Sequence, residues 1–481
     1  MDLLLILIIL LTLGGLSIPA FDLLFTKYKN LASQIICISI LTLSIFLLII
    51  PVVNPNLLYT DFPSLFNFDY LGIFFSITVI IVVILVAISS ISYQKDDENI
   101  AIYYSLLIFT TLGMILLSFS IDLLMIFVAW QLMSIPTFIL TGFKKNSVLS
   151  NEAAVKFFIL GAFSSGILLY GISLVYGLIG STNLYDMVNF YSTLPNGLEP
   201  IAYLSIILLI AGLGLKMAIV PFHMWLPDAL TGAPTPISAL LSAATKKSAF
   251  IVAIRIFLLA IPISAIGLKM DLMLTISILA LITMTVGNIA ALTQKSIKRL
   301  LAYSSIAHAG YILIGLAVGT QIGLVGLLYH VFNHGIMTSA AFIAVAAILK
   351  QGFKDDVKEL NGLGKIMPIT AALFTILLLA LAGVPPLNGF WSKFILFTAA
   401  VDSNLSWLAI AGVLNSAFSL GYYGWFIKRF YIDDPDLTNK TKIYEKSSFL
   451  VPLLIAVIII VLTGLFPSII YDFALKAVTS L

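Results

Sequence analysis

The chain has 481 residues, of which 61% are hydrophobic and only 10% are charged, and its formal net charge is +3. Soluble domains carry roughly a quarter charged residues, so this composition excludes a soluble protein and places the chain in a lipid bilayer. The single cysteine, Cys37, excludes a disulfide framework and a cysteine-based metal cluster.

About 14 apolar segments follow along the chain, each long enough to cross the hydrocarbon core as a helix. Lipid offers no hydrogen-bond partners to open strands, so we predict an all-α, polytopic membrane bundle. No basic stretch precedes the first segment, which is expected to be a span rather than a cleavable signal peptide. The predicted spans are residues 3–25, 31–50, 70–93, 101–119, 122–143, 155–178, 201–225, 234–260, 273–293, 300–318, 322–349, 368–400, 405–430 and 449–472.

The connections between these spans alternate between ones that are rich in Lys and Arg and ones that contain few. Of the 25 Lys and Arg residues, 18 lie in alternate connections, and only Lys269 and Lys476 lie on the opposite side. This asymmetry follows the positive-inside rule. Both termini are therefore expected on the non-cytoplasmic side of a cell membrane, or of an organelle inner or thylakoid membrane. The basic connections 350–367 and 428–447 are expected to dock or anchor the chain.

Lys216 lies inside the seventh predicted span, close to Gly212, Gly214 and Pro221. A charge at bilayer depth costs about 2.5–3.5 kcal/mol on insertion scales, so it needs a functional reason. Helix-weakening residues beside an intramembrane lysine are typical of the interrupted helices that line ion paths in transporters. The alternative is a lysine whose side chain extends to the membrane interface.

The twelfth predicted span repeats this arrangement, with Gly383, Pro385 and Pro386 before Lys393. Interrupted helices at matching positions indicate a midplane site between two repeats. We therefore predict two inverted five-helix repeats with discontinuous helices 7 and 12. The predicted units are residues 1–100 (helices 1–3), 101–260 (first repeat, helices 4–8), 273–430 (second repeat, helices 9–13) and 449–481 (helix 14).

Two lysines and three histidines lie in the spans between these breaks. Lys246 and Lys247 point about 100° apart, so one of them is expected to face the polar axis. His308 lies two spans later, and His330 and His334 share one helical face. Imidazole can accept a proton on one nitrogen and release one from the other, which favours a proton relay. The alternatives are buried, hydrogen-bonded histidines and a metal site, although a metal would need further ligands.

Three ordered motifs carry a resemblance to a known family. They are Val220–Ala229 with Gly232–Pro236, then Ser304–Tyr311, then Leu381–Pro386. Together they resemble the antiporter-like membrane subunits of respiratory complex I and related complexes. Two further segments are most similar to the N-type subunit, namely Asn151–Gly161 and Val413–Tyr423.

The resemblance implies a role for each buried titratable group. The relay residues it implies are Lys216 at the centre of the first half-channel, Lys246 as its partner, His308 and His334 as the bridge, and Lys393 in the second half. Additional relay candidates are Lys247, His330, His223 and Gln131, and the helix breaks are Pro221, Gly383, Pro385 and Pro386. The resemblance implies no metal and no cofactor in this chain, because flavin, iron–sulfur clusters and quinone belong to partner subunits. Those partners are further antiporter-like and small membrane subunits beside the lipid bilayer, with no nucleic acid.

Two positions depart from the family pattern. Gln131 stands where the family has a glutamate that pairs with the seventh-helix lysine, and Thr338 stands where the L- and M-type relatives have a lysine. None of the 22 acidic residues of the chain lies at mid-span. Lys216 is therefore expected to lack a counter-ion in its own chain.

These features favour a proton-translocating membrane-arm subunit of a complex I-like oxidoreductase. The chain would be a non-redox subunit of a translocase, with its relay coupled to electron transfer in partner subunits, since it has no phosphate cradle or nucleophile elbow. The alternatives are a subunit of a multi-chain cation/proton antiporter and a proton-inert structural subunit of the same arm. Nothing in the sequence marks the substrate pocket of an independent solute transporter.

Overall fold

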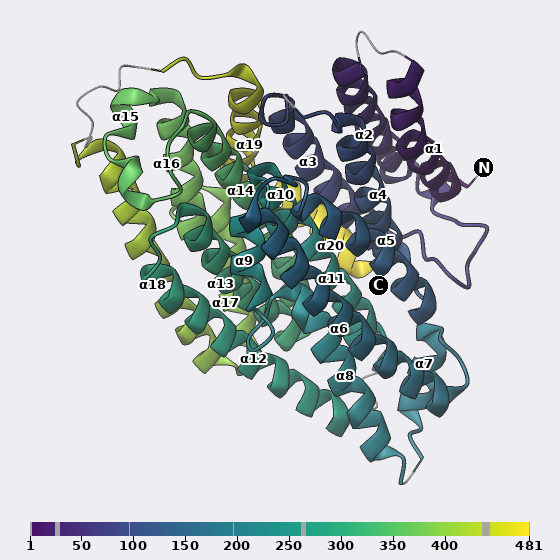
Figure 1. Ribbon diagram of the computed structural model, residues 1–481. Coiled ribbons are helices and arrows are strands. Elements are labelled where there is room, and N and C mark those ends of the chain that lie inside the picture. The colour runs from purple at the N-terminus through teal and green to yellow at the C-terminus, as the bar shows by residue number, and fades with distance from the viewer. Residues whose placement is uncertain are drawn as a thin grey trace.

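The computed structural model describes residues 2–24, 29–95, 97–195, 197–260, 266–434 and 443–480, and they form a helical bundle (Figure 1). Within these ranges, 12 helices are long and apolar enough to cross a membrane. The remaining two predicted spans correspond to a helix interrupted after Ala382 and to the helix Ser406–Tyr431. The protein is therefore an integral, multi-pass membrane protein, as its composition predicts.

The helices follow one another with short connections. In the first half they are α1 (Leu3–Leu24), α2 (Lys29–Val53), α3 (Tyr70–Tyr93), α4 (Ile100–Phe119), α5 (Leu123–Thr141), α6 (Val148–Ile179), α7 (Leu184–Ser192), α8 (Glu199–Met217) and α9 (Trp225–Gly232). One continuous crossing comes next, made of α10 (Thr235–Leu240), the π-helical turn η2 (Leu241–Thr245), α11 (Lys246–Ile254) and a second π turn η3 (Arg255–Leu259). The second half contains α12 (Ile266–Leu292), α13 (Ile297–Val318), α14 (Gln321–Lys350), α15 (Leu363–Ile366), α16 (Pro368–Ala382), α17 (Asn388–Asp402), α18 (Ser406–Tyr431), α19 (Ser447–Leu465) and α20 (Ser468–Thr479).

Side-chain caps set several helix starts that hydropathy alone misplaces. Ser147 accepts a hydrogen bond from Ser150 N, so α6 begins at Val148 rather than at the predicted residue 155. Ser296 caps α13 in the same way by accepting a hydrogen bond from Arg299 N, so this helix begins at Ile297 rather than at the predicted residue 300. Asp69 also caps α3, whose start was predicted correctly, by accepting a hydrogen bond from Gly72 N. A cap satisfies backbone donors that the first turn of a helix leaves unpaired, and it can therefore extend a helix beyond its apolar segment.

Helices 7 and 12 of the prediction are both discontinuous, as expected. The first break separates α8 from α9, with Ala218 in the left-handed conformation at φ 54° and a cis Val220–Pro221 bond. The second break separates α16 from α17, with Gly383 at φ 88° and a cis Pro385–Pro386 bond. Both breaks expose backbone groups inside the bundle, because a proline supplies no N–H to continue a helix.

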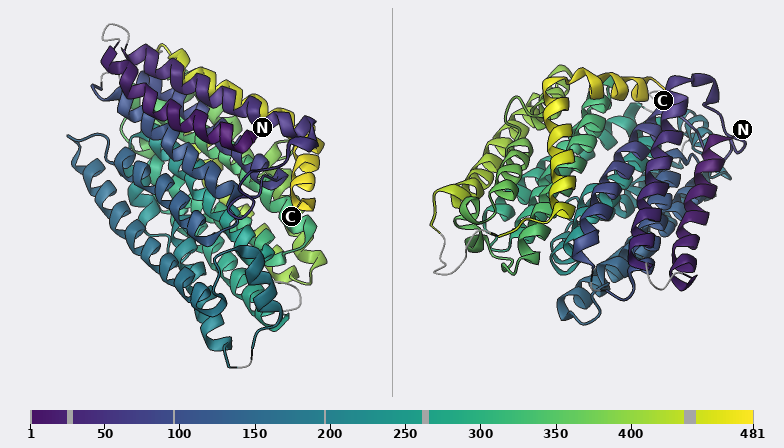
Figure 2. Two further views of the ribbon diagram at one scale, coloured as in Figure 1. Left: turned by 90° about the vertical axis from the view of Figure 1, so that its right-hand side faces the viewer. Right: turned by 90° about the horizontal axis from the view of Figure 1, so that it is seen from above.

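Two details of the sequence prediction are wrong. The last span does not run to residue 472, because Phe466 leaves the helical region before Pro467 and α20 starts as a separate helix. Figure 2 shows α20 lying across the bundle instead of continuing α19. The amphipathic helix α7 was not predicted.

The expectation that two basic connections dock or anchor the chain stays a prediction. In the connection 350–367, Val357 and Leu360 are buried against the chain itself. Of the connection 428–447, residues 435–442 lie outside the described residues.

The crossings that carry the candidate site lie at the centre of the bundle. Residues 235–257 and 323–348 are buried without interruption. In Figure 1 the purple helices α1 and α2 lie at one edge, and the green helices α16 and α18 lie at the opposite edge. The central helices are therefore surrounded by protein, which allows them to hold the titratable residues that lipid would exclude.

Candidate functional site

Lys216 lies in the last turn of α8, directly before the first helix break, and its side chain is buried. Its Nζ donates a hydrogen bond to Ser134 Oγ at 3.2 Å. The ammonium also lies 4.9 Å from the ring centroid of Phe157 and 5.6 Å from that of Phe138, which gives it two cation–π contacts. Lys216 therefore does not extend to the membrane interface, and its surroundings are a hydroxyl and aromatic faces.

Gln131 lies on α5, three residues before Ser134 and on the same helical face. Its Oε1 accepts a hydrogen bond from Ser165 Oγ at 3.1 Å, so the amide is tied to α6. The hydrogen bond that Lys216 donates to α5 goes to Ser134 instead. The neutral side chain of Gln131 thus occupies the position of the family's glutamate. It lies one turn from Ser134, the hydrogen-bond partner of Lys216.

His223 lies in the break itself and is 9% exposed. Its Nδ1 has no hydrogen-bond partner among the described residues. The break is held in place from both sides, since Val220 N donates to Thr283 Oγ1 and Trp225 Nε1 donates to Leu215 O. His223 therefore occupies the segment of chain that connects the Lys216 helix to the Lys246 helix.

Lys246 and Lys247 are both completely buried. Lys246 Nζ donates hydrogen bonds to Ser305 O at 2.6 Å and to Ser305 Oγ at 3.2 Å, and Ser242 Oγ donates to the same Ser305 Oγ. Lys247 Nζ has no hydrogen-bond partner among the described residues. Lys246 is thus tied to α13 by hydrogen bonds, whereas Lys247 is not, and the expectation that one of the two faces the polar axis stays a prediction.

The three histidines of α13 and α14 form one buried cluster. His308 Nδ1 lies 3.0 Å from His330 Nε2, and the ring centroids of His308 and His334 are 4.4 Å apart. His334 bonds to Thr338 Oγ1 one turn later, at the position where other family types have lysine. Within the described part of the chain, these rings do not belong to any group of three or more residues arranged to hold a metal ion. The cluster can accept and release protons through adjacent imidazoles.

Lys393 lies in α17 and reaches back into the second break. Its Nζ donates hydrogen bonds to Leu381 O at 3.1 Å, Ala382 O at 3.0 Å and Ser416 Oγ at 3.0 Å. The two carbonyls belong to the last turn of α16, where the negative end of the helix dipole favours a cation. A Cβ at Gly383 would lie 3.1 Å from Lys393 Cδ, so this glycine is required by the lysine as well as by its positive φ.

A cavity of about 410 Å³ opens beside Lys393 between α16, α17 and α18. Its polar lining includes Lys393 and Ser416, and its apolar lining includes Phe394, Phe397 and Val413. The ammonium of Lys393 also lies 5.0 Å from the ring centroid of Tyr311, which is in ring contact with His308. The lysine thus stands between an accessible space and the imidazole cluster.

The structure joins most of the predicted relay residues but not all of them. Lys246 reaches Ser305, one turn before His308, and His330 Nδ1 lies 2.9 Å from Ser392 Oγ, next to Lys393. Lys216 has no hydrogen bond to Lys246 or to an imidazole among the described residues, and His223 lies in the segment between them. The candidate site is therefore a row of neighbouring groups from Lys246 to Lys393, in which His308 Nε2 has no hydrogen-bond partner among the described residues, and Lys216 lies on the other side of the first break.

A buried polar network beside this row was not predicted. Asn288 Nδ2 donates to Tyr311 OH and to Asn415 Oδ1, and Tyr422 OH donates to Asn288 Oδ1. Tyr423 OH pairs with the hydroxyl of Ser304. Asn415, Tyr422 and Tyr423 lie in the segment that is most similar to the N-type subunit, and this similarity was the only signal in the sequence.

A second unpredicted feature is the buried ion pair between Arg255 and Asp69. Arg255 Nη1 and Nη2 donate to the two carboxylate oxygens at 3.0 and 2.9 Å, and Nε donates to Ser118 O at 2.9 Å. Arg255 is fully buried and Asp69 is 6% exposed. Four hydrogen bonds thus hold the guanidinium, two of them in bidentate geometry to Asp69, and they connect η3 to α3 and α4.

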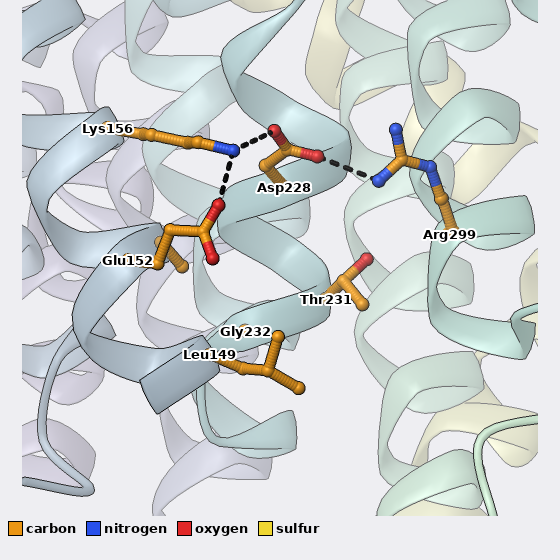
Figure 3. Close-up of a pocket in the computed structure, with 8 residues that line it drawn as sticks. Leu149, Glu152, Lys156, Asp228, Thr231, Gly232 and Arg299 are labelled. Carbon is orange, nitrogen blue, oxygen red and sulfur yellow. Dashed lines mark hydrogen bonds and ion pairs between the residues drawn. The ribbon is translucent and has the colours of Figure 1, made fainter. Parts of the chain in front are cut away.

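Ionic contacts also connect the two halves of the bundle at the end of α9 (Figure 3). Asp228 accepts hydrogen bonds from Lys156 Nζ at 3.1 Å and Arg299 Nη1 at 2.7 Å, and Lys156 also contacts Glu152 at 2.7 Å. These residues line a cavity of about 210 Å³ between α6, α9 and α13. Because the pairs are partly exposed, solvent screens them and they add little to stability, and their main effect is to fix α9 between its neighbours.

Comparison with known proteins identifies relatives of the whole bundle. A family model described as NADH:quinone oxidoreductase/Mrp antiporter, TM, matches residues 120–419. F(420)H(2) dehydrogenase subunit N of Methanosarcina mazei is 39% identical over 429 residues, which cover 87% of this chain and 85% of the relative. NADH-quinone oxidoreductase subunit N of Trichlorobacter lovleyi is 39% identical over 416 residues, covering 85% and 84%.

Solved structures share the same architecture. A chain of respiratory complex I from Thermus thermophilus is 25% identical with a TM-score of 0.81, and the alignment covers 97% of this chain and 98% of that one. A chain of the Mrp complex from Dietzia superposes with a TM-score of 0.87 at 20% identity, covering 100% and 97%. The chain therefore belongs to the family of antiporter-like transmembrane subunits of NADH:quinone oxidoreductases and Mrp antiporters, as a member of its N type.

Proposed function

We propose that the chain moves protons across the membrane as the N-type subunit in the membrane arm of a complex I-like respiratory oxidoreductase. The observation that carries this proposal is the buried row of proton-exchanging groups from Lys246 through His308, His330 and His334 to Lys393. A buried ammonium can give up its proton and become neutral, and a neighbouring imidazole can receive it. Such groups suit protons better than sodium ions, which require oxygen ligands.

In this scheme the two breaks serve as the entry and exit points of the relay. Lys216 and Lys393 each lie beside exposed backbone in the middle of the bundle, and Lys393 also lines a cavity. The charge of Lys393 is held by two carbonyls and a hydroxyl rather than by a carboxylate, so its proton can leave without separating an ion pair. The ammonium of Lys216, held by Ser134 and two aromatic rings, has the same property.

Electron transfer belongs to partner subunits in this proposal, and the chain is their proton-translocating, non-redox partner. Flavin, iron–sulfur clusters and quinone are assigned to those subunits, together with further antiporter-like and small membrane subunits around this one. The excess of Lys and Arg in alternate connections supports placing both termini on the non-cytoplasmic side.

The first test measures protons pumped per electron by the purified complex in vesicles. Lys216→Met and Lys393→Met should each lower pumping by at least about tenfold, because each removes an obligatory proton-exchanging group. Electron transfer should slow in step if the two processes are coupled. Wild-type pumping and electron transfer in both variants, with normal assembly, would make the chain a structural member of the arm instead.

A second prediction concerns Gln131. Gln131→Glu places a carboxylate one turn from Ser134, the partner of Lys216, and creates the counter-ion that the family pattern contains. We expect pumping to increase by up to about twofold in the Lys216-containing chain and to stay unchanged in a Lys216→Met background, because the carboxylate acts through that lysine. Gln131→Met is the neutral control, and an equal gain in both backgrounds would contradict this coupling.

A further inference from the structure

Lys247 is a buried cation that the relay described above leaves unused, and unlike Arg255 and Lys298 it has no hydrogen-bond partner among the described residues. It lies next to Lys246 in the same continuously buried crossing, and both side chains are 0% exposed. Lys246 has two hydrogen bonds to Ser305, whereas Lys247 Nζ has none among the described residues. An ammonium without partners in a protein interior is unfavourable, so stability does not account for this residue.

The helix that the Lys247 side chain faces can be derived from the residues one turn before the two lysines. Ser242 and Lys246, four residues apart, both reach Ser305 on α13. Ala243 precedes Lys247 by the same interval, and helical side chains lean back over the preceding turn. The carbonyl oxygen of Ala243 lies 3.3 Å from the position of a Cβ on Gly335, so this face of the helix touches α14 directly beside His334.

The charge of Lys247 acts on the ring of His334, as that of Lys246 does, which is consistent with this direction. The side chains of the two adjacent lysines therefore face different helices: Lys246 faces α13, and Lys247 faces α14. The rings of His308 and His334 are in contact, so both directions lead into the same imidazole cluster.

We propose that Lys247 is a second proton carrier of this site, which exchanges its proton with His334. The inference rests on the proposed function and adds a residue to it. In the transfer, the lysine side chain first brings Nζ within hydrogen-bond reach of a ring nitrogen of His334. An N–H bond of the ammonium then breaks, its electron pair stays on Nζ, and an N–H bond forms at that ring nitrogen. The positive charge thereby moves from α11 to α14. Two neighbouring ammonium groups repel each other, so a proton arriving on Lys246 favours release from Lys247.

The test uses three variants of the intact complex in vesicles, with protons pumped per electron as the readout. Lys247→Met removes both the charge and the exchangeable proton, whereas Lys247→Arg keeps a charge that does not deprotonate. Ser248→Ala is the matched control, because Ser248 is the next residue, is equally buried and does not titrate. If Lys247 carries protons, pumping falls at least about tenfold in both Lys247 variants and stays normal in Ser248→Ala.

Other outcomes overturn the inference. Normal pumping in Lys247→Arg would mean that a fixed charge is sufficient, and normal pumping in Lys247→Met would mean that the residue is not used. If neither Lys247 variant assembles while Ser248→Ala does, the residue serves the fold and not the transfer. Lys216→Met and Lys393→Met are measured in parallel, so that failure of this inference can be distinguished from failure of the proposed function. A pumping defect in these two variants with normal Lys247 variants refutes only this inference, and normal pumping in both of them refutes the proposed function.

Discussion

Replacing Arg255 with methionine should prevent the subunit from assembling, which is the largest stability effect that we expect in this chain. The change leaves the buried carboxylate of Asp69 without its bidentate partner and leaves Ser118 O without two of its donors. Removing one partner of a buried ion pair typically costs about 3–5 kcal/mol, because the remaining charge is uncompensated. The measurement is the amount of assembled complex on a native gel, with thermal unfolding of whatever complex is recovered.

The double variant Arg255→Met with Asp69→Asn provides the control. It removes both charges, and the asparagine side chain keeps an oxygen that can still accept the cap hydrogen bond from Gly72 N. We expect it to recover most of the assembly, since replacing a buried ion pair as a unit is often nearly neutral. If Arg255→Met alone assembles normally, the ion pair does not hold η3, α3 and α4 together.

The largest effect on activity is expected for His308→Phe. His308 is the imidazole that contacts both His330 and His334, and it lies one turn after the Ser305 that holds Lys246. Phenylalanine keeps a planar ring and the packing but cannot carry a proton. General acid–base groups contribute 10²–10⁴-fold, so pumping should fall by about 100-fold. The assay is proton pumping per electron in vesicles of the assembled complex.

Tyr311→Phe is the matched control on the same helix. It keeps the ring that lies below Lys393 and removes only the hydroxyl that bonds to Asn288. We expect pumping to stay within about twofold of the wild type, because the phenol is not one of the transfer groups. Equal losses in both variants would assign the effect of His308→Phe to packing in α13 rather than to proton transfer.

The overall fold could be predicted from the sequence because the bilayer imposes a simple rule. Apolar segments of the right length must be helices. The alternation of basic connections tests the number of spans independently. The two breaks were also predictable, since the prolines near Lys216 and Lys393 have no N–H to continue a helix and the glycines beside them weaken it. Helix ends were predicted less well, because Ser147 extends α6 by a cap and Phe466–Pro467 ends α19 early, and neither effect changes hydropathy.

For the site, the sequence identified the titratable residues but not their partners. Residues that cost free energy in a bilayer stand out individually, which is why Lys216, Lys246 and Lys393 were found. Their partners are ordinary groups, such as Ser134, Ser305 and the carbonyls of α16, and nothing in the composition distinguishes these from other serines and carbonyls. The pair of Arg255 with Asp69 was missed for a related reason, since 186 residues separate its members and only the packing of η3 on α3 brings them together.

The continuous burial of residues 235–257 has a consequence for the biogenesis of the protein. This crossing contains Lys246, Lys247 and Arg255, each of which costs about 2.5–3.5 kcal/mol at the centre of an isolated inserting helix. Helices α3, α4 and α8 contact it and all precede it in the chain. During synthesis they are in the membrane first and offer protein surface in place of lipid. Because of this order along the chain, the charged crossing can insert against protein surface instead of lipid when it emerges from the ribosome.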